Sequence, residues 1–357
     1  MKELFKDIKV IELAGVLAGP SVGYFFSELG AKVIKVENPN HGGDITRSWK
    51  LKNENPKEKT SAYFWSVNAF KEFIELDIKQ GKNLKILYEL IKDADIVITN
   101  YKKGDDKKLK VDYLSLKKIN PQIIYASING FGVNSTRTAY DLILQAESGF
   151  MFMNGEPNSI PTKMPVALID LLAGHQLKEA ILIALLKKYK EKKGSYISVS
   201  LFDSAIASLA NQATNWLIGK HLPIASGSLH PNIAPYGELF ATKDKHYITF
   251  AIGSNKQFEA LCKVINNTSL PRDVKFSTNQ NRIKNRQELY GILNNHISKF
   301  NFKDIFKLCE QNEIPMGKIR NMKEVFEIPE AKEMLHQLQY GKDIKHVVSS
   351  IAFKFND

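Results

Sequence analysis

Short apolar runs and longer mixed stretches alternate through the first part of the chain. Residues 10–13 form a bounded apolar run, which suits a buried strand. Small residues follow at 14–20, where Pro20 is placed to open a helix that Gly30 ends. Residues 32–36 form the next β run. This order predicts a parallel βαβ unit, in which ligands bind in the crevice at the C-terminal ends of the strands.

The same alternation continues beyond this unit. Further strands are predicted at residues 73–76, 96–99, 123–126 and 195–200. Further helices are predicted at residues 81–91, 113–118 and 171–189, and one long helix rich in Ala and Ser is predicted at 200–217. Strands that alternate with helices favour a doubly wound α/β domain.

Composition adds limits of its own. A chain of 357 residues with 43% hydrophobic and 25% charged residues is typical of a globular protein with room for two domains. We find no apolar run long enough to span a bilayer and no signal-peptide core at the N-terminus. Cys262 and Cys309 are too few for a disulfide framework and are expected to be buried apolar residues rather than metal ligands. We therefore expect a cytoplasmic protein without a metal site.

The net charge of +12 raises the possibility of a nucleic-acid partner. The lysines are dispersed, however, and most are expected on solvated surfaces. No basic stripe interleaved with aromatic residues and no recognised nucleic-acid motif is present. A cationic surface would equally attract a small anionic ligand, so charge alone does not decide the partner.

Asp170 is the strongest candidate for chemistry. It is an acid within the otherwise apolar stretch 165–174. An unpaired charge is costly to bury, so this carboxylate needs a partner, a capping role or a function. One interpretation makes Asp170 the N-cap of the helix that follows. The other makes it a functional carboxylate, which a helix N-terminus would also stabilise.

Seven segments, in order, resemble the class III CoA-transferases. This CaiB–BaiF family includes formyl-CoA transferase, carnitine CoA-transferase and the 2-methylacyl-CoA racemases. The segments are the first fifty residues and residues 94–104, 119–132, 139–149, 168–174, 200–217 and 229–262. The resemblance implies transfer of coenzyme A between an acyl-CoA and a small carboxylate, with coenzyme A as a substrate and not a permanently bound cofactor. It also implies an interlocked homodimer of two linked rings.

The domain organisation combines composition with this resemblance. Residues 219–235, rich in Pro and Gly, have the composition of a linker. We expect a large CoA-binding, Rossmann-like α/β domain at 1–218 and a smaller α+β domain at 236–318, with a strand at 247–252. By the resemblance, residues 319–357 return to the large domain.

Asp170 matches the catalytic aspartate of the family. A carboxylate with an ordinary pKa of about 3.9 is ionised at neutral pH and can act as a nucleophile. The resemblance implies that Asp170 attacks an acyl-CoA thioester to form a mixed anhydride. The released CoA thiolate then forms an Asp170–CoA thioester, from which a second carboxylate takes the CoA.

The resemblance also implies a CoA site. It assigns to that site Val16, Leu17, Lys71, Asn100, Tyr101, Lys108 and Tyr140. Leu17 stands where some formyl-CoA transferases carry glutamine, and leucine cannot donate a hydrogen bond, which disfavours formate and oxalate as substrates. Core packing for Val16 and Leu17, an Asn-based turn for Asn100 and a solvated Lys108 remain alternatives. Glu72 and Phe73, which follow Lys71, depart from the family's Lys-Arg-Ser.

His230 and Tyr140 bear on substrate and reaction type. His230 belongs to a loop that the family places beside the acyl pocket, although a loop-stabilising hydrogen bond is the alternative. The racemases carry histidine where this chain has Tyr140, and tyrosine with an ordinary pKa near 10 is a poor base at neutral pH. A CoA-transferase is therefore favoured over a 2-methylacyl-CoA racemase. A non-catalytic CoA-binding or nucleic-acid-binding protein remains the rival from another class.

Overall fold

The chain forms two compact units in the computed structural model, which describes residues 3–341 and 343–355. The large unit runs to Asn154 and includes Pro161–Pro223 and the stretch from Glu333 onward. The small unit comprises Gly155–Ile160 and Ile224–Lys332. The large unit is therefore assembled from three separate parts of the sequence.

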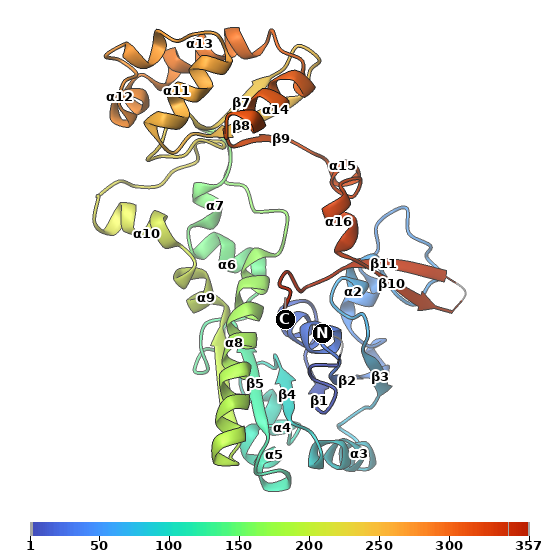
Figure 1. Ribbon diagram of the computed structural model, residues 1–357. Coiled ribbons are helices and arrows are strands. Elements are labelled where there is room, and N and C mark those ends of the chain that lie inside the picture. The colour runs from blue at the N-terminus through green and yellow to red at the C-terminus, as the bar shows by residue number, and fades with distance from the viewer. Residues whose placement is uncertain (1–2, 342, 356–357) are drawn as a thin grey trace. The chain divides into compact units, whose positions relative to one another are not determined.

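The large unit is built on one parallel sheet (Figure 1). Its strands are β1 (Lys9–Glu12), β2 (Lys32–Glu37), β3 (Glu72–Glu75), β4 (Ile96–Thr99), β5 (Ile124–Asn129) and β6 (Ser195–Ser200). They lie in the order β3-β2-β1-β4-β5-β6, and all neighbours are parallel. In a doubly wound sheet of this order, the crevice for ligands lies at the C-terminal ends of the strands where the order reverses, between β1 and β4.

Helices cover both faces of this sheet. They are α1 (Ala18–Glu28), α2 (Ala62–Trp65), α3 (Gly81–Lys92), α4 (Asp105–Lys108), α5 (Tyr113–Ile119), α6 (Asp141–Glu147), α7 (Phe150–Met153), α8 (Leu168–Glu191), α9 (Leu201–Ala207) and α10 (Ala210–Leu217), with two 3-10 turns at Pro39–His41 and Ile45–Ser48. Val10 of β1 faces the core formed with α1 and α8, whereas its neighbour Ile11 faces the core formed with α3 and α5. Alternate strand residues point to opposite faces, so apolar side chains at successive positions serve both cores.

The predicted long helix at 200–217 is wrong as a single helix. The structure divides it into α9 and α10, because Ala210 adopts a φ of 46°. A residue with a side chain rarely takes this left-handed conformation, and a right-handed helix cannot continue through it. The other predicted elements of the large unit are present, with ends displaced by at most a few residues.

The small unit has a separate core. Its antiparallel sheet, in the order β7-β8-β9, consists of β7 (Tyr236–Ala241), β8 (Tyr247–Ala251) and β9 (Met316–Lys318). Its other elements are α11 (Asn255–Val264), a 3-10 turn at Leu270–Arg272, α12 (Asn279–Lys284), α13 (Arg286–Ile297), α14 (Phe302–Gln311), α15 (Met322–Val325) and most of α16 (Pro329–Glu333). Cys262 and Cys309 are both free and buried in this core.

The C-terminal hairpin packs on the large unit. It consists of β10 (Leu335–Tyr340) and β11 (Asp343–Val348), and it lies beside α2 in Figure 1. Leu338 and Val347 join the apolar cluster of Tyr24 and Trp65. The buried Glu28 carboxylate, at the end of α1, accepts hydrogen bonds from His336 Nε2 at 2.7 Å, Ser349 Oγ at 2.7 Å and the Ser350 N–H at 2.8 Å. The C-terminal hairpin and the two serines that follow it are thus tied to the first helix.

Two features are absent from the described residues. Among residues 3–341 and 343–355, no helix is long and apolar enough to cross a membrane. The same part of the chain holds no group of three His, Cys, Asp or Glu side chains placed to bind a metal ion.

Candidate active site

A strained turn follows β1 at the predicted crevice. Val16 has a φ of 71°, a conformation that is rare for a β-branched residue. The Gly15 N–H donates to Asn100 Oδ1 at 3.1 Å, and Asn100 Nδ2 donates back to the Gly15 carbonyl at 2.8 Å. The Val16 N–H donates to Asp44 Oδ2 at 3.1 Å. Side chains from two other segments therefore hold this turn in an unfavourable backbone conformation.

Asp170 lies in the first turn of α8 but does not cap it. The N-cap is Ala167, and no side chain of the cap residue binds the helix, so the N-cap interpretation of Asp170 is wrong. Instead, Asp141 Oδ1 accepts the Ile169 N–H at 2.8 Å, and Asp141 Oδ2 accepts from Gln145 Nε2 at 2.7 Å. Asp141 thus satisfies one of the free N–H groups that every helix N-terminus carries.

The surroundings of Asp170 oppose its ionisation. The residue is 8% exposed, and no hydrogen bond or ion pair reaches its carboxylate from the rest of the described chain. Burial, and secondarily the negative charge of Asp141, raises the pKa of Asp170 to about 7. A buried carboxylate without a partner is unusual for a structural residue and typical of a functional one.

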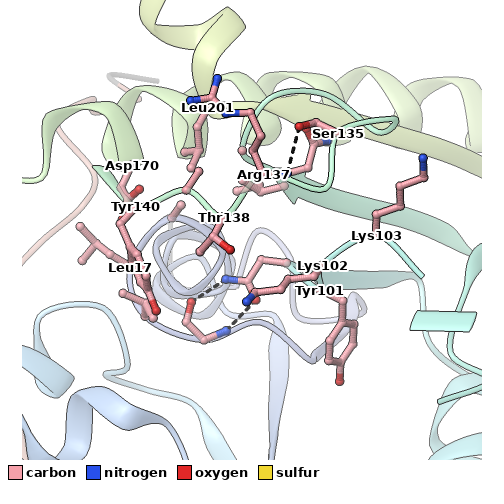
Figure 2. Close-up of a pocket in the computed structure, with 18 of the residues that line it drawn as sticks. Leu17, Tyr101, Lys102, Lys103, Ser135, Arg137, Thr138, Tyr140, Asp170 and Leu201 are labelled. Atoms are coloured by element: carbon pink, nitrogen blue, oxygen red, sulfur yellow. Dashed lines mark hydrogen bonds between the residues drawn. The ribbon is translucent and has the colours of Figure 1, made fainter. Parts of the chain in front are cut away.

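A cavity of about 280 Å³ opens in front of Asp170. Of the predicted site residues it brings together Val16, Leu17, Asn100, Tyr101, Tyr140 and Asp170. Figure 2 shows Asp170, Tyr140 and Leu17 at one side of this cavity and Lys103 at the other. Sequence reasoning missed three cations that line it: Lys102, Lys103 and Arg137.

A second cavity, of about 510 Å³, adjoins the first. The two share lining residues, among them Tyr101, Lys102 and Lys103. The second cavity adds Lys107 and the stacked rings of Tyr113 and Tyr196, whose centroids are 5.5 Å apart. Together the cavities offer cations and aromatic faces along a path suited to an elongated anion that carries a ring.

Three of the predicted residues, Lys71, Lys108 and His230, lie outside the cavity of Asp170. Lys71 is fully buried, and its Nζ donates to Glu12, Asn68 and the Pro20 carbonyl. Lys108 is exposed and pairs with Asp105 at 2.9 Å. Neither lysine lines a cavity that contains Asp170.

His230 belongs to the small unit and stabilises its own loop. Its Nδ1 accepts the Asn232 N–H at 3.1 Å, and its ring packs against Tyr236. This contact matches the loop-stabilising alternative.

Sequence reasoning also missed Asp44 and Lys35. The signal was present, because Lys35 interrupts the apolar β2 between Ile34 and Val36. A lysine on a strand covered on both faces needs a buried anion as its partner. In the structure Lys35 pairs with two such anions, Glu12 and Asp44.

Comparison with known proteins places this fold in a family. Residues 5–357 match the family described as CoA-transferase family III. Succinate–glutarate CoA-transferase of Agrobacterium fabrum is 38% identical over 93% of this chain and 84% of its own length. Human succinyl-CoA:glutarate CoA-transferase is 38% identical over 91% of this chain and 74% of its own. The crystal structure of a CaiB/BaiF family protein from Brucella suis has a TM-score of 0.83 and 36% identity, and covers 98% of this chain and 92% of its own.

Proposed function

The chain belongs to CoA-transferase family III, and we propose that it moves CoA between short dicarboxylates, with Asp170 as the nucleophile. The observation that carries this proposal is the buried, unpartnered Asp170 carboxylate in a cavity lined by Lys102, Lys103 and Arg137. The relatives named for succinate and glutarate support the choice of substrates. Succinyl-CoA is the proposed donor and glutarate the proposed acceptor.

The proposed reaction exchanges acyl groups on Asp170. An Asp170 oxygen attacks the thioester carbonyl of the acyl-CoA, the C–S bond breaks, and a mixed anhydride and CoA thiolate form. The thiolate attacks the Asp170 carbonyl of the anhydride, which releases the first acid as a carboxylate and leaves an Asp170–CoA thioester. The acceptor carboxylate attacks this thioester, and the same steps in reverse produce the new acyl-CoA and restore Asp170. Every bond broken is replaced, and no external oxidant or resident cofactor is needed.

The first turn of α1 supplies donors for the oxyanions of this reaction. A helix N-terminus leaves its first N–H groups without intrahelical partners, and the apolar side chain of the N-cap residue Leu17 cannot cap α1. Leu17 and Ala18, at this end of the helix, line the same cavity as Asp170. Backbone N–H groups fixed beside a reacting carbonyl stabilise the negative charge that develops on its oxygen. Lys102, Lys103 and Arg137 favour the anionic CoA in the same cavity.

The functional form proposed is a cytoplasmic, intertwined homodimer. The large unit is discontinuous in sequence. Large apolar side chains also remain exposed along one face of α8, where Ile183 at 67%, Leu186 at 66% and Tyr189 at 78% follow at intervals of three residues. Contiguous exposed apolar surface marks protein–protein contacts, and a second copy of this chain is the proposed partner.

A substrate panel tests the proposed function. Purified protein with succinyl-CoA should form glutaryl-CoA from glutarate faster than it forms CoA esters of formate or oxalate. Asp170→Ala should abolish transfer while CoA binding changes by less than about tenfold, because only the nucleophile is removed. Full activity in Asp170→Ala would contradict the mechanism.

Two measurements separate this reaction from its rivals. With hydroxylamine and succinyl-CoA, mass spectrometry should find the modification on the peptide that contains Asp170, because an activated acyl group there is open to attack. In heavy water, 2-methylacyl-CoA should gain negligible α-deuterium, since Tyr140 stands in place of the racemase histidine. Rapid deuterium incorporation without an acceptor acid would support racemisation instead.

A further inference from the structure

Three consecutive residues of the turn after β1 are fastened by side chains. Lys35 Nζ donates to the Ala14 carbonyl at 2.7 Å. Asn100 holds both polar groups of Gly15, and Asp44 accepts the Val16 N–H. These contacts come from β2, from the loop after β2 and from the end of β4. The turn that opens α1 is thus anchored from three directions.

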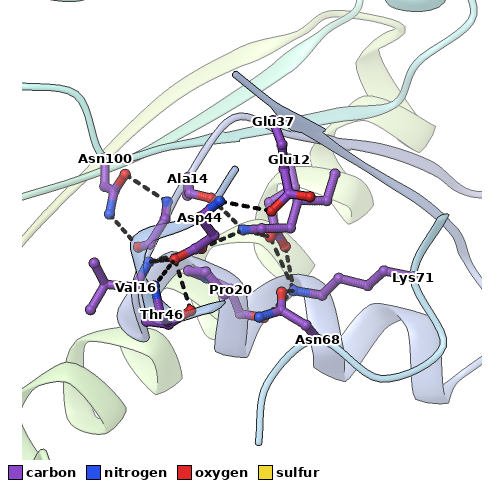
Figure 3. Close-up of polar contacts among 12 residues, drawn as sticks. Glu12, Ala14, Val16, Pro20, Glu37, Asp44, Thr46, Asn68, Lys71 and Asn100 are labelled. Carbon is purple, nitrogen blue, oxygen red and sulfur yellow. Dashed lines mark hydrogen bonds and ion pairs between the residues drawn. The ribbon is translucent and has the colours of Figure 1, made fainter. Parts of the chain in front are cut away.

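Asp44 and Lys35 belong to a buried group of charges. Lys35 Nζ lies 2.8 Å from Glu12 Oε1 and 3.0 Å from Asp44 Oδ2. Glu12 Oε2 lies 2.8 Å from Lys71 Nζ. The side chains of Glu12, Lys35, Asp44 and Lys71 are at most 1% exposed. Figure 3 shows Asp44 between Val16 and Thr46 on one side and Glu12 on the other.

Stability alone does not explain this group. Burying two carboxylates and two ammonium groups incurs a desolvation penalty that their attraction does not reliably recover. The contact between Asp44 and Val16 also maintains a φ of 71° in a residue that disfavours it. Both unfavourable features meet at the entrance of α1, beside the cavity of Asp170.

The charges of Lys35 and Asp44 persist despite burial. Burial opposes the charge of Lys35, but Glu12 and Asp44 outweigh it and raise the pKa of Lys35 above its ordinary value. Burial likewise opposes the charge of Asp44, but Lys35 and the donors of Thr46 hold the pKa of Asp44 below its usual range. The Asp44 carboxylate is therefore ionised at neutral pH and a strong acceptor for the Val16 N–H.

We propose that Asp44, held by Lys35, is a positioning residue for CoA transfer. By fixing Val16 at positive φ, Asp44 sets the direction of the backbone N–H groups of Leu17 and Ala18 toward the oxyanion that forms at Asp170. The role rests on the proposed function. Asp44 itself does not touch the substrate, because its carboxylate is buried behind the turn.

Asp44→Asn tests this role against a matched control. Asp95 is bonded in the same way, since it accepts the Lys9 N–H at 3.0 Å and Lys188 Nζ at 2.7 Å, but it precedes β4 at the opposite end of the strand from the cavity. Misdirected oxyanion donors should lower kcat by about 10- to 100-fold in Asp44→Asn, with KM for succinyl-CoA changed by less than about threefold. Asp95→Asn should leave both constants within about twofold. Equal kcat in the two variants, or a rise in KM alone, would overturn the proposal.

A double-mutant cycle with Val16→Gly identifies the mechanism of positioning. Glycine adopts positive φ without steric cost, so the turn should depend less on Asp44 in that background. The loss of kcat caused by Asp44→Asn should then be at least about fivefold smaller in Val16→Gly than in the wild type. The same loss in both backgrounds would show that Asp44 does not act through the conformation of Val16.

Hydrogen exchange keeps the test independent of the substrates. In Asp44→Asn the amides of Gly15 and Val16, which are hydrogen-bonded in the wild type, should exchange at least about tenfold faster, while exchange in β5 is unchanged. Unchanged exchange at Gly15 and Val16 contradicts the positioning role, whereas absence of succinyl-CoA:glutarate transfer in the wild type contradicts only the proposed function. If Asp44→Asn does not fold, Thr46→Val replaces it. That variant removes the hydroxyl that donates to Asp44 Oδ1 at 2.8 Å, and it should show the same changes with smaller factors.

Discussion

Asp170 has the chemistry of a nucleophile that its surroundings keep partly protonated. Its pKa of about 7 in the folded protein lies well above the value of 3.8 for a free side chain. The nucleophile must be ionised, so kcat/KM should rise with pH and level off above an apparent pKa of about 7. A profile that is flat between pH 5 and pH 8 would contradict this.

The same shift predicts a pH-dependent stability. Between pH 3.8 and about 7 the folded protein binds the Asp170 proton and the unfolded chain does not, so the free energy of unfolding falls as pH rises through this window. In Asp170→Asn this proton is absent, so the free energy of unfolding should not fall in this way. Relative to the wild type, the free energy of unfolding of Asp170→Asn should therefore rise by about 2 kcal/mol from pH 5 to pH 8. Urea unfolding at the two pH values measures the gain, and the exposed Glu89→Gln serves as the control that should show none.

The candidate site was partly visible at the scale of residues. Asp170 stood out as an acid in an apolar run, and the small residues after β1 marked the turn. The position of Lys71 was not visible, because its ion-pair partner Glu12 lies on β1, far away in sequence. Asp44 was missed for the same reason, since its role depends on contacts between β2, the following loop and the turn at Val16.

At the scale of elements, the break between α9 and α10 predicts that the same substitution, alanine to glycine, changes stability in opposite directions at two positions. Ala210→Gly should stabilise the protein by about 1 kcal/mol, because glycine accepts the φ of 46° that alanine resists. Ala180→Gly, in the interior of α8, should destabilise it by about 1 kcal/mol. Thermal unfolding of both variants checks the signs. Destabilisation in both would mean that the break between α9 and α10 is not strained.

The tie between α1 and the C-terminal hairpin gives a second prediction. Glu28→Ala leaves the partly buried donors of His336, Ser349 and Ser350 without their acceptor and should reduce the free energy of unfolding by about 2–3 kcal/mol. Limited proteolysis should then cut within residues 335–350 before other sites. Glu89→Ala, which removes an exposed pair with Lys92, is the control and should be nearly silent. Equal effects would show that Glu28 does not hold the hairpin.

Elements were the most predictable level of the fold. Strand β4 has the predicted ends because Asp95 and Asn100 bound its apolar run, and β6 begins where predicted because Gly194 marks the preceding turn. The break at Ala210 could not be predicted, because alanine favours helix and no glycine or proline marks the positive φ at this position. The α/β class and the parallel sheet are confirmed by the strand order. The predicted domain boundaries stay a prediction.

At the scale of the whole molecule, the proposed homodimer has a direct test. Sedimentation at nanomolar concentration should find only a dimer, because an intertwined assembly has no stable folded monomer to populate. Dilution should therefore lose dimer and folded structure together. A folded monomer under these conditions would refute the intertwined assembly while leaving the chemistry of Asp170 untouched.

The return of the chain to its first helix also sets an order of events during synthesis. The ribosome makes residues 224–332 before the hairpin that covers Tyr24 and binds Glu28. At about 5–20 residues per second, this interval lasts roughly 5–20 s, long enough for the small unit to fold first. Chains stalled before residue 335 emerges should accordingly be more sensitive to protease near α1 than released chains. The speed of translation through the small unit therefore determines how long the nascent large unit exposes an apolar surface to chaperones and to aggregation.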